Sequence, residues 1–290
     1  MTTNPNPRVY HSFWSKPLLE KRFERTVIDQ LESTLLFTAI GVAYAKKLNL
    51  QIVLHTDDFG VEIFGFLPYD KIYRTLNGHD IHRALWASGK MIALAHEPLG
   101  SCHLDMDAWI KKTAGRDFIF NNKKDLVTQN IEDSLATYEG IKKIILDNVD
   151  LTKHINLSMS ENHRAYNCGL IRLNNQKLKD KWLKAYWDIT DTLNRKQPHN
   201  LREKYCIPDL ISEQWMLYQI CQQNNFSVDT ICNGWNDKLN PKKLGYTHLI
   251  SEGKYKVDDR LKEILRNLDA ELYTQVINKI RGIEKWNFYQ

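Results

Sequence analysis

The feature that most constrains the fold is an alternation of strand and helix patterns at the start of the chain. Residues 8–14 have the pattern of a strand, and residues 31–48 carry apolar side chains at helical spacing. An apolar, β-branched run over residues 50–55 follows and ends at Thr56-Asp57-Asp58. Strand, helix and strand in this order are typical of the opening of a parallel sheet. The sequence therefore predicts an α/β fold.

Further patterns predict the remaining elements. We expect helices over residues 80–88, 178–193 and 212–221, and one long helix from residue 258 onward. Strands are expected over residues 101–110, 165–173 and 228–231. Ser212 is a candidate cap for its helix, and Asp258 or Asp259 for the last one.

We expect one domain over residues 1–290, without an internal repeat. It would consist of a nucleotide-binding half (8–110), an acceptor half (111–256) and a C-terminal helix (257–290). Pro198 and Pro208 bound a polar linker whose ends can lie close together, so it need not divide two domains.

Composition excludes some classes of function. The net charge is only +5 and basic residues alternate with acids, which disfavours a nucleic-acid-binding surface. The five cysteines show no zinc spacing, and an odd number favours buried, reduced thiols inside a cell. Residues 1–7 are polar, and no apolar run approaches the roughly 18 residues that span a bilayer. These features predict a cytoplasmic protein.

Asp105-Met106-Asp107 is the one Asp-x-Asp in the sequence. On a strand, both carboxylates would lie on the same face, where they repel each other unless a cation lies between them. Oxygen ligands of this kind suit Mg²⁺ or Mn²⁺. A solvated strand end is the alternative. A haloacid dehalogenase-type phosphatase also uses Asp-x-Asp, but Trp109 stands where that motif has Thr or Val.

Several short motifs follow one another in a recognisable order. They are His11-Ser12-Phe13-Trp14, Leu54-His55-Thr56-Asp57, Leu67-Pro68-Tyr69-Asp70, Lys90 before Met91-Ile92-Ala93-Leu94, His103-Leu104-Asp105-Met106-Asp107, Tyr166-Asn167-Cys168-Gly169-Leu170-Ile171, Ser212-Glu213-Gln214-Trp215, Gly245-Tyr246-Thr247-His248 and Gly253-Lys254. In order and spacing the chain resembles GT-A glycosyltransferases over residues 8–255, especially an uncharacterised bacterial group related to the family 8 sugar transferases.

The resemblance implies a metal site and a donor site. Asp105, Asp107 and His248 would hold Mn²⁺ or Mg²⁺, although His248 is equally compatible with an ordinary loop histidine. The donor nucleotide sugar would be bound by residues at the carboxyl ends of strands and near the late Gly-Lys turn: Ser12, Thr56, Asp57, Lys90, Gly169 and Lys254. Some of these residues also have an alternative without a ligand. Thr56-Asp57 would be a simple strand-to-loop turn, Lys90 a structural lysine at a helix end, and Lys254 a surface lysine.

Three residues resemble the catalytic part of the family: Asn167, Glu213 and Gln214. As an alternative, Glu213 lies in the first turn of a helix and only complements the helix dipole. For Asn167 the alternative is a β-bulge that binds no ligand. The chain departs from the family pattern with Glu213-Gln214 in place of Asp-Gln, and with Tyr255 after Gly253-Lys254 where Pro-Trp is usual. These departures leave acceptor geometry and stereochemistry open.

The expected function is transfer of a hexose from a UDP-type donor to a saccharide or lipid-linked acceptor, with the family 8 likeness favouring retention. A nucleotidyltransferase is one rival, disfavoured because residues 12–17 contain no glycine to cradle a triphosphate. A non-catalytic binding protein of the same fold is the other. The C-terminal segment carries basic and aromatic residues that are compatible with a membrane surface, or with packing on its own domain: Lys279, Arg281, Lys285, Trp286, Phe288 and Tyr289.

Overall fold

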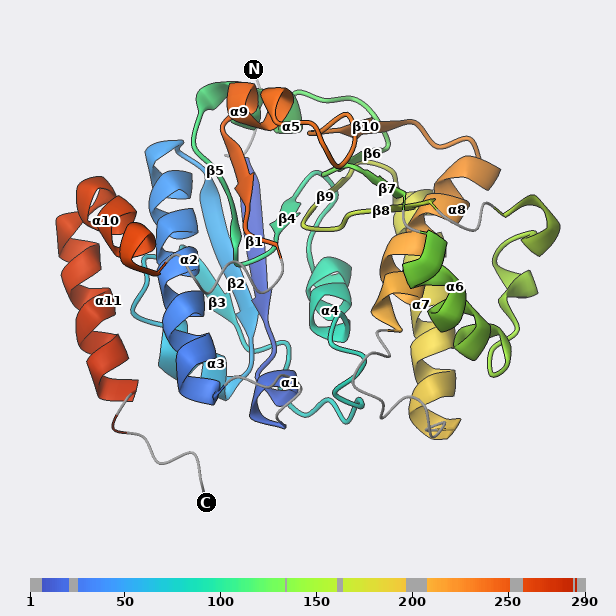
Figure 1. Cartoon of the computed structure of the whole chain (residues 1–290), viewed down its shortest axis with the longest axis horizontal. Helices are drawn as coiled ribbons and strands as arrows, with labels where there is room; N and C mark the ends of the chain where they lie inside the picture. The colour runs from blue at the N-terminus through green and yellow to red at the C-terminus, as the bar shows by residue number, and fades with distance from the viewer. Residues whose placement is uncertain are drawn as a thin grey trace.

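The computed structural model describes residues 7–20, 26–133, 135–160, 164–196, 208–250, 258–283 and 285. Its centre is a seven-stranded sheet with the strand order β10-β6-β9-β4-β1-β2-β3 (Figure 1). β1 is parallel to β2 and β4, β2 to β3, and β10 to β6, whereas β9 runs antiparallel to both of its neighbours. The strands are β1 (Arg8–Phe13), β2 (Gln51–Thr56), β3 (Lys71–Tyr73), β4 (Cys102–Leu104), β6 (Leu126–Thr128), β9 (Leu170–Leu173) and β10 (Val228–Thr230).

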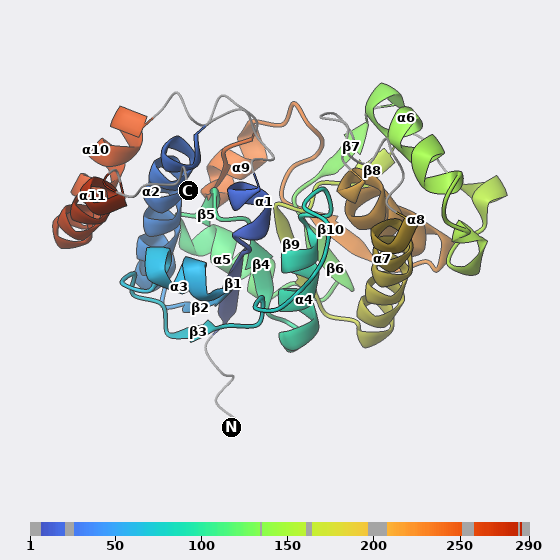
Figure 2. The same cartoon turned by 90° about the horizontal axis from the view of Figure 1, so that it is seen from below.

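Helices cover both faces of this sheet, which confirms the predicted α/β class with a mainly parallel mixed sheet. The two faces separate residue by residue along β1, because Tyr10 packs with α4 and α7 whereas Val9 packs with α2. Figures 1 and 2 show α10 and α11 outside α2, and α7 and α8 at the opposite end of the molecule. The helices are α1 (Lys16–Leu19), α2 (Val27–Lys47), α3 (Asp58–Phe64), α4 (Ser88–His96), α5 (Thr113–Phe120), α6 (Leu135–Leu146), α7 (Gln176–Lys196), α8 (Met216–Gln223), α9 (Leu239–Leu244), α10 (Asp258–Leu268) and α11 (Ala270–Ile283).

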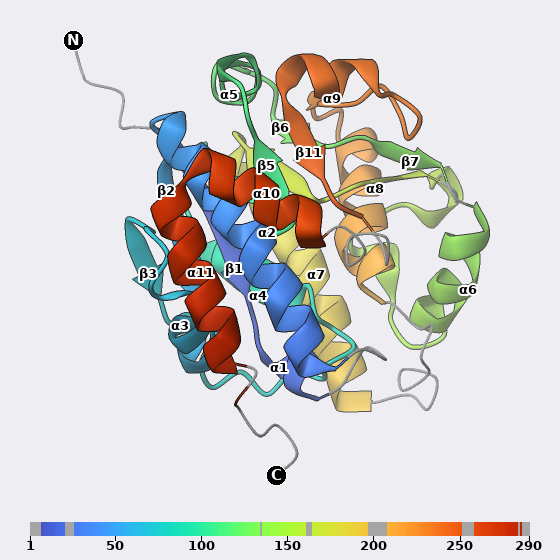
Figure 3. The same ribbon diagram turned by 60° about the vertical axis from the view of Figure 1, so that its left-hand side comes forward.

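Two small antiparallel sheets complete the frame. β5 (Ala108–Ile110) and β11 (Tyr246–His248) lie side by side (Figure 3). Their pairing places His248 opposite Ala108. β7 (Ile131–Asp133) pairs with β8 (Arg164–Tyr166). The pairing of β5 with β11 brings His248 next to the acidic turn that follows β4, although the two are far apart in the sequence.

The expected single strand over residues 101–110 is wrong. The chain leaves the main sheet after Leu104, makes a turn in which the Ala108 amide donates to the Asp105 carbonyl (2.9 Å), and then begins β5. Asp105 and Asp107 therefore lie on a turn between two different sheets, and strand alternation does not place them. The cause is tertiary, because residues 108–110 pair with β11 and not with the main sheet.

Other predicted boundaries also change. The strand expected over residues 165–173 is two strands, β8 and β9, separated by Asn167-Cys168-Gly169. The helix expected over residues 80–88 is wrong as well, since that segment forms turns and α4 runs from Ser88 to His96. The start of α4 is set by a distant side chain, because Asp209 accepts a hydrogen bond from the Ala87 amide (2.9 Å). No local pattern signals such a contact.

Two of the three helices predicted for the second half are interrupted, whereas the helix expected over residues 178–193 is the continuous helix α7. A π-helical segment, η4 (Leu210–Trp215), precedes α8, and Ser212 lies inside it and not at a cap. The expected long C-terminal helix is two helices, because Asp269 ends α10 and accepts a hydrogen bond from the Leu272 amide (2.9 Å) at the start of α11. Asp258 lies in the first turn of α10 and accepts a hydrogen bond from Ser33 on α2 (3.0 Å).

Two expectations concern the compartment. Cys102, Cys168, Cys221 and Cys232 are buried free thiols, as expected, and Cys206 lies outside the described residues. Within the described ranges, no helix combines the length and the hydropathy needed to cross a bilayer. Pro198 and most of the polar linker also lie outside these ranges, as do the aromatic residues Trp286, Phe288 and Tyr289.

The contact of α10 with α2 gives a first prediction. Leu265 is fully buried in the core that α2, α10 and α11 share. Leu265→Ala should lower the free energy of unfolding by about 2–5 kcal/mol, through lost burial and a residual cavity. Urea denaturation measures this value, with Glu263→Ala on the exposed face of α10 as the control. Equal stability of the two variants would show that α10 does not contribute to the core.

Candidate metal centre and adjoining cavity

The turn between β4 and β5 and the end of β11 bring three possible metal ligands together. His248 Nε2 lies 3.3 Å from Asp107 Oδ1 and 3.8 Å from Asp105 Oδ2. One ligand atom from each of the three residues lies within 4.8 Å of the others. Ligands that share one cation at roughly 2.0–2.2 Å are separated by roughly 3–4 Å, so these side chains can reach a common ion. The arrangement fits a divalent metal.

His248 is oriented for this role by Gln129. The Gln129 side-chain oxygen lies 2.6 Å from His248 Nδ1 and accepts a second hydrogen bond from the Tyr246 hydroxyl (2.7 Å). An amide oxygen only accepts hydrogen bonds, so Nδ1 of His248 carries the proton. The lone pair is then on Nε2, which faces the two aspartates. Hydrogen bonding of the non-ligating nitrogen is the usual way in which proteins orient a metal-binding histidine.

Gly169 leaves room for this imidazole. A Cβ atom at residue 169 would lie 2.4 Å from His248 Cε1 and 2.7 Å from Gln129 Oε1. Its carbonyl also accepts a hydrogen bond from the Asp105 amide (3.0 Å), so the same residue fixes the start of the acidic turn. The structure thus places Gly169 against a metal-ligand candidate and in the wall of the cavity described below.

Lys90 supplies the only positive charge in contact with the acidic turn among the described ion pairs. Its ammonium group lies 2.8 Å from Asp105 Oδ1 and 2.8 Å from Glu213 Oε1, and donates to the Cys168 carbonyl (3.0 Å). Burial lowers the pKa of Lys90, but the two carboxylates outweigh this effect and raise it above its ordinary value. Lys90 therefore stays charged, and its three protons all have partners.

Glu213 lies behind Lys90, in the π-helical segment η4. Its side chain is 1% exposed and is not among the residues that line the cavity. Burial raises the pKa of Glu213 to about 7, with a further contribution from Asp105, while Lys90 opposes the shift. One ammonium group cannot neutralise two carboxylates, so the more deeply buried carboxyl group retains its proton to higher pH.

The cluster contains three carboxyl groups and one ammonium group, those of Asp105, Asp107, Glu213 and Lys90. Ionised carboxylates this close repel one another, and a bound cation removes the repulsion. The repulsion between the carboxylates and the ligand geometry are therefore both compatible with a cation between Asp105, Asp107 and His248.

Sequence reasoning gave no role to Gln129 and His103. His103 Nε2 lies 3.1 Å from the Ser12 hydroxyl, and its Nδ1 lies 3.7 Å from Asp105 Oδ1. Burial lowers the pKa of His103 well below its ordinary value, and Lys90 adds to the effect, so the imidazole is neutral. His103 could have been predicted as a site residue because it lies two residues before Asp105 in the sequence. No motif or spacing in the sequence predicts the contact of Gln129 with His248.

A cavity of about 560 Å³ opens beside the cluster. The elements that surround it include the end of β1, helices α1 and α2, the start of α4, the segment η4, the end of β11, and the turns that carry Asp105 and Asn167. Its walls combine aromatic rings with polar groups. Of the predicted site residues, those that line it are Ser12, Lys90, Asp105, Asp107, Asn167, Gly169, Gln214 and His248.

Thr56 and Asp57 lie elsewhere and have internal partners. The Thr56 hydroxyl donates to the Phe13 carbonyl (2.7 Å). Asp57 accepts hydrogen bonds from the Ser15 amide (2.8 Å) and from the Gly60 amide (2.9 Å), which caps α3. Their expected nucleotide contacts therefore stay predictions. Lys254 lies outside the described residues.

Asn167 connects the cavity wall to the acidic turn. Its side-chain oxygen accepts a hydrogen bond from the Gly169 amide (2.9 Å), and its side-chain nitrogen donates to Glu132 (2.5 Å). The Asp105 amide in turn donates to the Gly169 carbonyl. Glu132, Asn167, Gly169 and Asp105 thus form one continuous hydrogen-bonded path along the wall.

Comparison with known proteins identifies the family but not its function. A family model described as a family of unknown function, DUF6734, matches residues 8–280, and the chain belongs to this family. A search of curated proteins gives no match.

Three solved structures are similar at TM-scores below 0.5. The apo structure of the bifunctional glycosyltransferase WbbM has a TM-score of 0.44 and 12% identity, over 94% of this chain and 52% of that one. The chain thus spans about half of WbbM. The inositol-1-phosphate CTP transferase from T. maritima gives 0.39 and 11%, over 90% and 98%. The galactosyltransferase LgtC in complex with donor and acceptor sugar analogues gives 0.39 and 13%, over 90% and 96%.

Removal of the hydrogen bond that orients His248 gives a second prediction. Gln129→Leu should weaken Mn²⁺ binding by roughly 10–100-fold, because the Nδ1 proton loses its acceptor and the ring is free to turn. Electron paramagnetic resonance of free Mn²⁺ measures the affinity, with Gln176→Leu on the exposed first turn of α7 as the control. Unchanged Mn²⁺ affinity in a folded Gln129→Leu protein would contradict the assigned orientation.

The raised pKa of Glu213 gives a third prediction, for metal-free protein. The pKa of this carboxyl group is about 7 in the folded protein and roughly 4.3 in the unfolded chain, so between these values the folded state binds more protons. The free energy of unfolding therefore falls as the pH rises from about 4.3 to about 7. Glu213→Gln removes this effect. Between pH 4.5 and pH 7.5 the variant should gain on the order of 1–3 kcal/mol over the unmodified chain.

Denaturant unfolding at a series of pH values tests this difference. The two proteins should have diverging stability profiles, with the larger change below pH 7 and a plateau above it. Parallel profiles would mean that Glu213 is ionised throughout this range and is fully compensated by Lys90.

Proposed function

We propose that this chain is a metal-dependent glycosyltransferase that moves a hexose from a UDP-type nucleotide sugar to a saccharide or lipid-linked acceptor. The observation that carries the proposal is the combination of Asp105, Asp107 and His248, with ligand atoms that can reach one cation, at the wall of a cavity of about 560 Å³. The motif order of the sequence, which resembles GT-A enzymes, supports the same assignment.

Mn²⁺ or Mg²⁺ fits the residues present. Asp105 and Asp107 supply carboxylate oxygens, and His248 supplies the Nε2 lone pair that Gln129 leaves exposed. When bound, the cation would supply Lewis-acid stabilisation of the negative charge that develops on the departing nucleoside diphosphate. The protein contributes the fixed positions of these ligands, set by β4, β5 and β11.

The cavity suits a nucleotide sugar in both size and composition. Phe13, Trp14 and Trp86 contribute flat apolar surfaces that suit a nucleobase and ribose, and the acidic turn lines the same cavity. A cation at the acidic turn would place the diphosphate beside Asp105 and Lys90. Because the Lys90 protons are engaged, Lys90 would act on the donor through its charge and not through a direct hydrogen bond.

The transfer exchanges one bond at the anomeric carbon for another. The acceptor hydroxyl oxygen forms a bond to the anomeric carbon, the bond from that carbon to the diphosphate oxygen breaks, and the hydroxyl proton is released. Gln214 and Asn167 line the cavity and would position the sugar. Glu213 would act from behind Lys90 by setting the electrostatics. Retention at the anomeric carbon stays a prediction, which NMR of the product's anomeric proton decides.

Isothermal titration of UDP with and without Mn²⁺ tests the metal site and gives a fourth prediction. Asp105→Asn combined with Asp107→Asn should weaken Mn²⁺-dependent UDP binding by roughly a hundredfold, because the cation loses both carboxylates. Asp259→Asn, at an exposed position of α10, is the control and should bind as the unmodified chain does. Equal UDP affinity in the double variant would contradict the metal assignment.

Turnover separates a transferase from its rivals. A panel of UDP-hexoses incubated with Mn²⁺ should release free sugar slowly, because water can replace the acceptor. Absence of release from every donor would indicate a binding protein. Pyrophosphate formed from a nucleoside triphosphate and a sugar phosphate, without sugar release from UDP-hexoses, would instead indicate a nucleotidyltransferase.

A further inference from the structure

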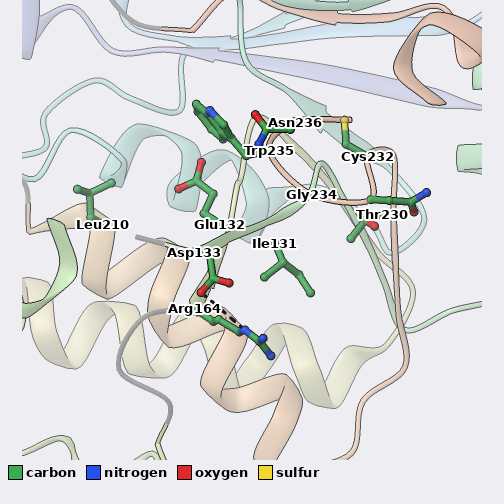
Figure 4. Close-up of a pocket in the computed structure, with 11 residues that line it drawn as sticks. Ile131, Glu132, Asp133, Arg164, Leu210, Thr230, Cys232, Gly234, Trp235 and Asn236 are labelled. Atoms are coloured by element: carbon green, nitrogen blue, oxygen red, sulfur yellow. Dashed lines mark ion pairs between the residues drawn. The ribbon is translucent and has the colours of Figure 1, made fainter. Parts of the chain in front are cut away.

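A second, larger cavity adjoins the cavity of about 560 Å³ beside Asp105, which we call the metal-side cavity. It has a volume of about 950 Å³ and is bounded by β7, the start of β8, η4 and the segment that follows β10 (Figure 4). Glu132 and Leu210 line both cavities, so the two cavities adjoin at these residues. Glu132 is therefore the point at which a ligand in the second cavity comes nearest to the cavity that contains Asp105 in its wall.

Trp235 forms an exposed aromatic wall of the second cavity. Its side chain is 61% exposed, which is unusual for a residue of this size, and Figure 4 shows it across the cavity from Asp133 and Arg164. An indole ring has a flat apolar face and a polar edge. A pyranose ring has the matching form, with C–H groups on its faces and hydroxyl groups around its rim.

The segment that carries Trp235 is fixed at its base to the metal centre. The Cys232 amide donates to the Gln129 carbonyl (2.8 Å), and Gln129 also holds His248. Gly234 has φ of +120°, a conformation that side-chain-bearing residues rarely adopt, and turns the chain just before Trp235. The aromatic wall and the metal ligand are therefore positioned by one residue, Gln129.

The charges that line the second cavity favour a neutral ligand. Glu132 and Asp133 are acidic and Arg164 is basic, with 3.8 Å between Arg164 Nε and Asp133 Oδ1. Among the described residues that line the cavity there is thus no cluster of basic side chains of the kind that binds a phosphate or a nucleotide. Carboxylates and side-chain amides, such as those of Asn233 and Asn236, form hydrogen bonds with hydroxyl groups.

We propose that this cavity is the acceptor site and binds an uncharged saccharide. One sugar ring would stack on Trp235, and the hydroxyl group that points toward the metal-side cavity would donate a hydrogen bond to Glu132. This assignment rests on the proposed glycosyltransferase function and narrows its acceptor to a neutral sugar. Glu132 is suited to this contact because Asn167 already holds its carboxylate at the junction (2.5 Å).

Saturation-transfer difference NMR tests the site, with lactose, maltose, cellobiose and chitobiose as probes in the presence of UDP and Mn²⁺. At least one of these neutral disaccharides should show ring-proton saturation. Trp235→Ala should reduce its affinity by roughly tenfold or more, because the stacking surface is lost, and Trp235→Tyr should restore most of it. Sialyllactose, which carries a carboxylate, should bind more weakly than lactose.

Leu239→Ala is the matched control, since Leu239 is another exposed apolar residue of the same region but does not line the cavity. Both variants should retain UDP–Mn²⁺ binding by calorimetry. Retained UDP binding with no saccharide signal, or with a signal that Trp235→Ala leaves unchanged, would overturn the acceptor site alone. Loss of metal-dependent UDP binding in the unmodified chain would overturn the proposed function instead.

Discussion

The interaction on which the site depends is the close approach of Asp105 and Asp107 to His248 and Lys90. Lys90 compensates part of the negative charge from inside the protein, and Glu213 shares that compensation. On the cavity side, His248 Nε2 lies beside both aspartates. One ligand atom from each of these three residues can reach a common cation, which would remove the repulsion between the carboxylates.

Two different pairings of the backbone create this arrangement. β4 belongs to the main sheet, whereas β5 leaves it and pairs with β11, so the acidic turn is held at both ends by separate sheets. Gln129 then connects His248, a candidate metal ligand, to the segment that carries Trp235. The cavity beside the acidic turn and the second cavity also share Glu132 and Leu210 in their walls.

The α/β class was predictable from the sequence because strand and helix periodicities are local. The Asp-x-Asp pair was also visible, but its place on a turn was not, since β5 is defined by its pairing with the distant β11. His248 could be assigned only through the family resemblance. The contacts of Lys90 with Glu213, and of Gln129 with His248, join segments far apart in the chain, and no spacing rule marks such pairs.

Anomalous X-ray diffraction at the manganese edge, on crystals of the 290-residue chain grown with UDP and Mn²⁺, is a direct test of the metal site. We expect one manganese peak within bonding distance of Asp105, Asp107 and His248 Nε2, with a UDP phosphate oxygen in the same coordination shell. A manganese peak at another position, or ordered UDP in the cavity with no metal between these three residues, would contradict it.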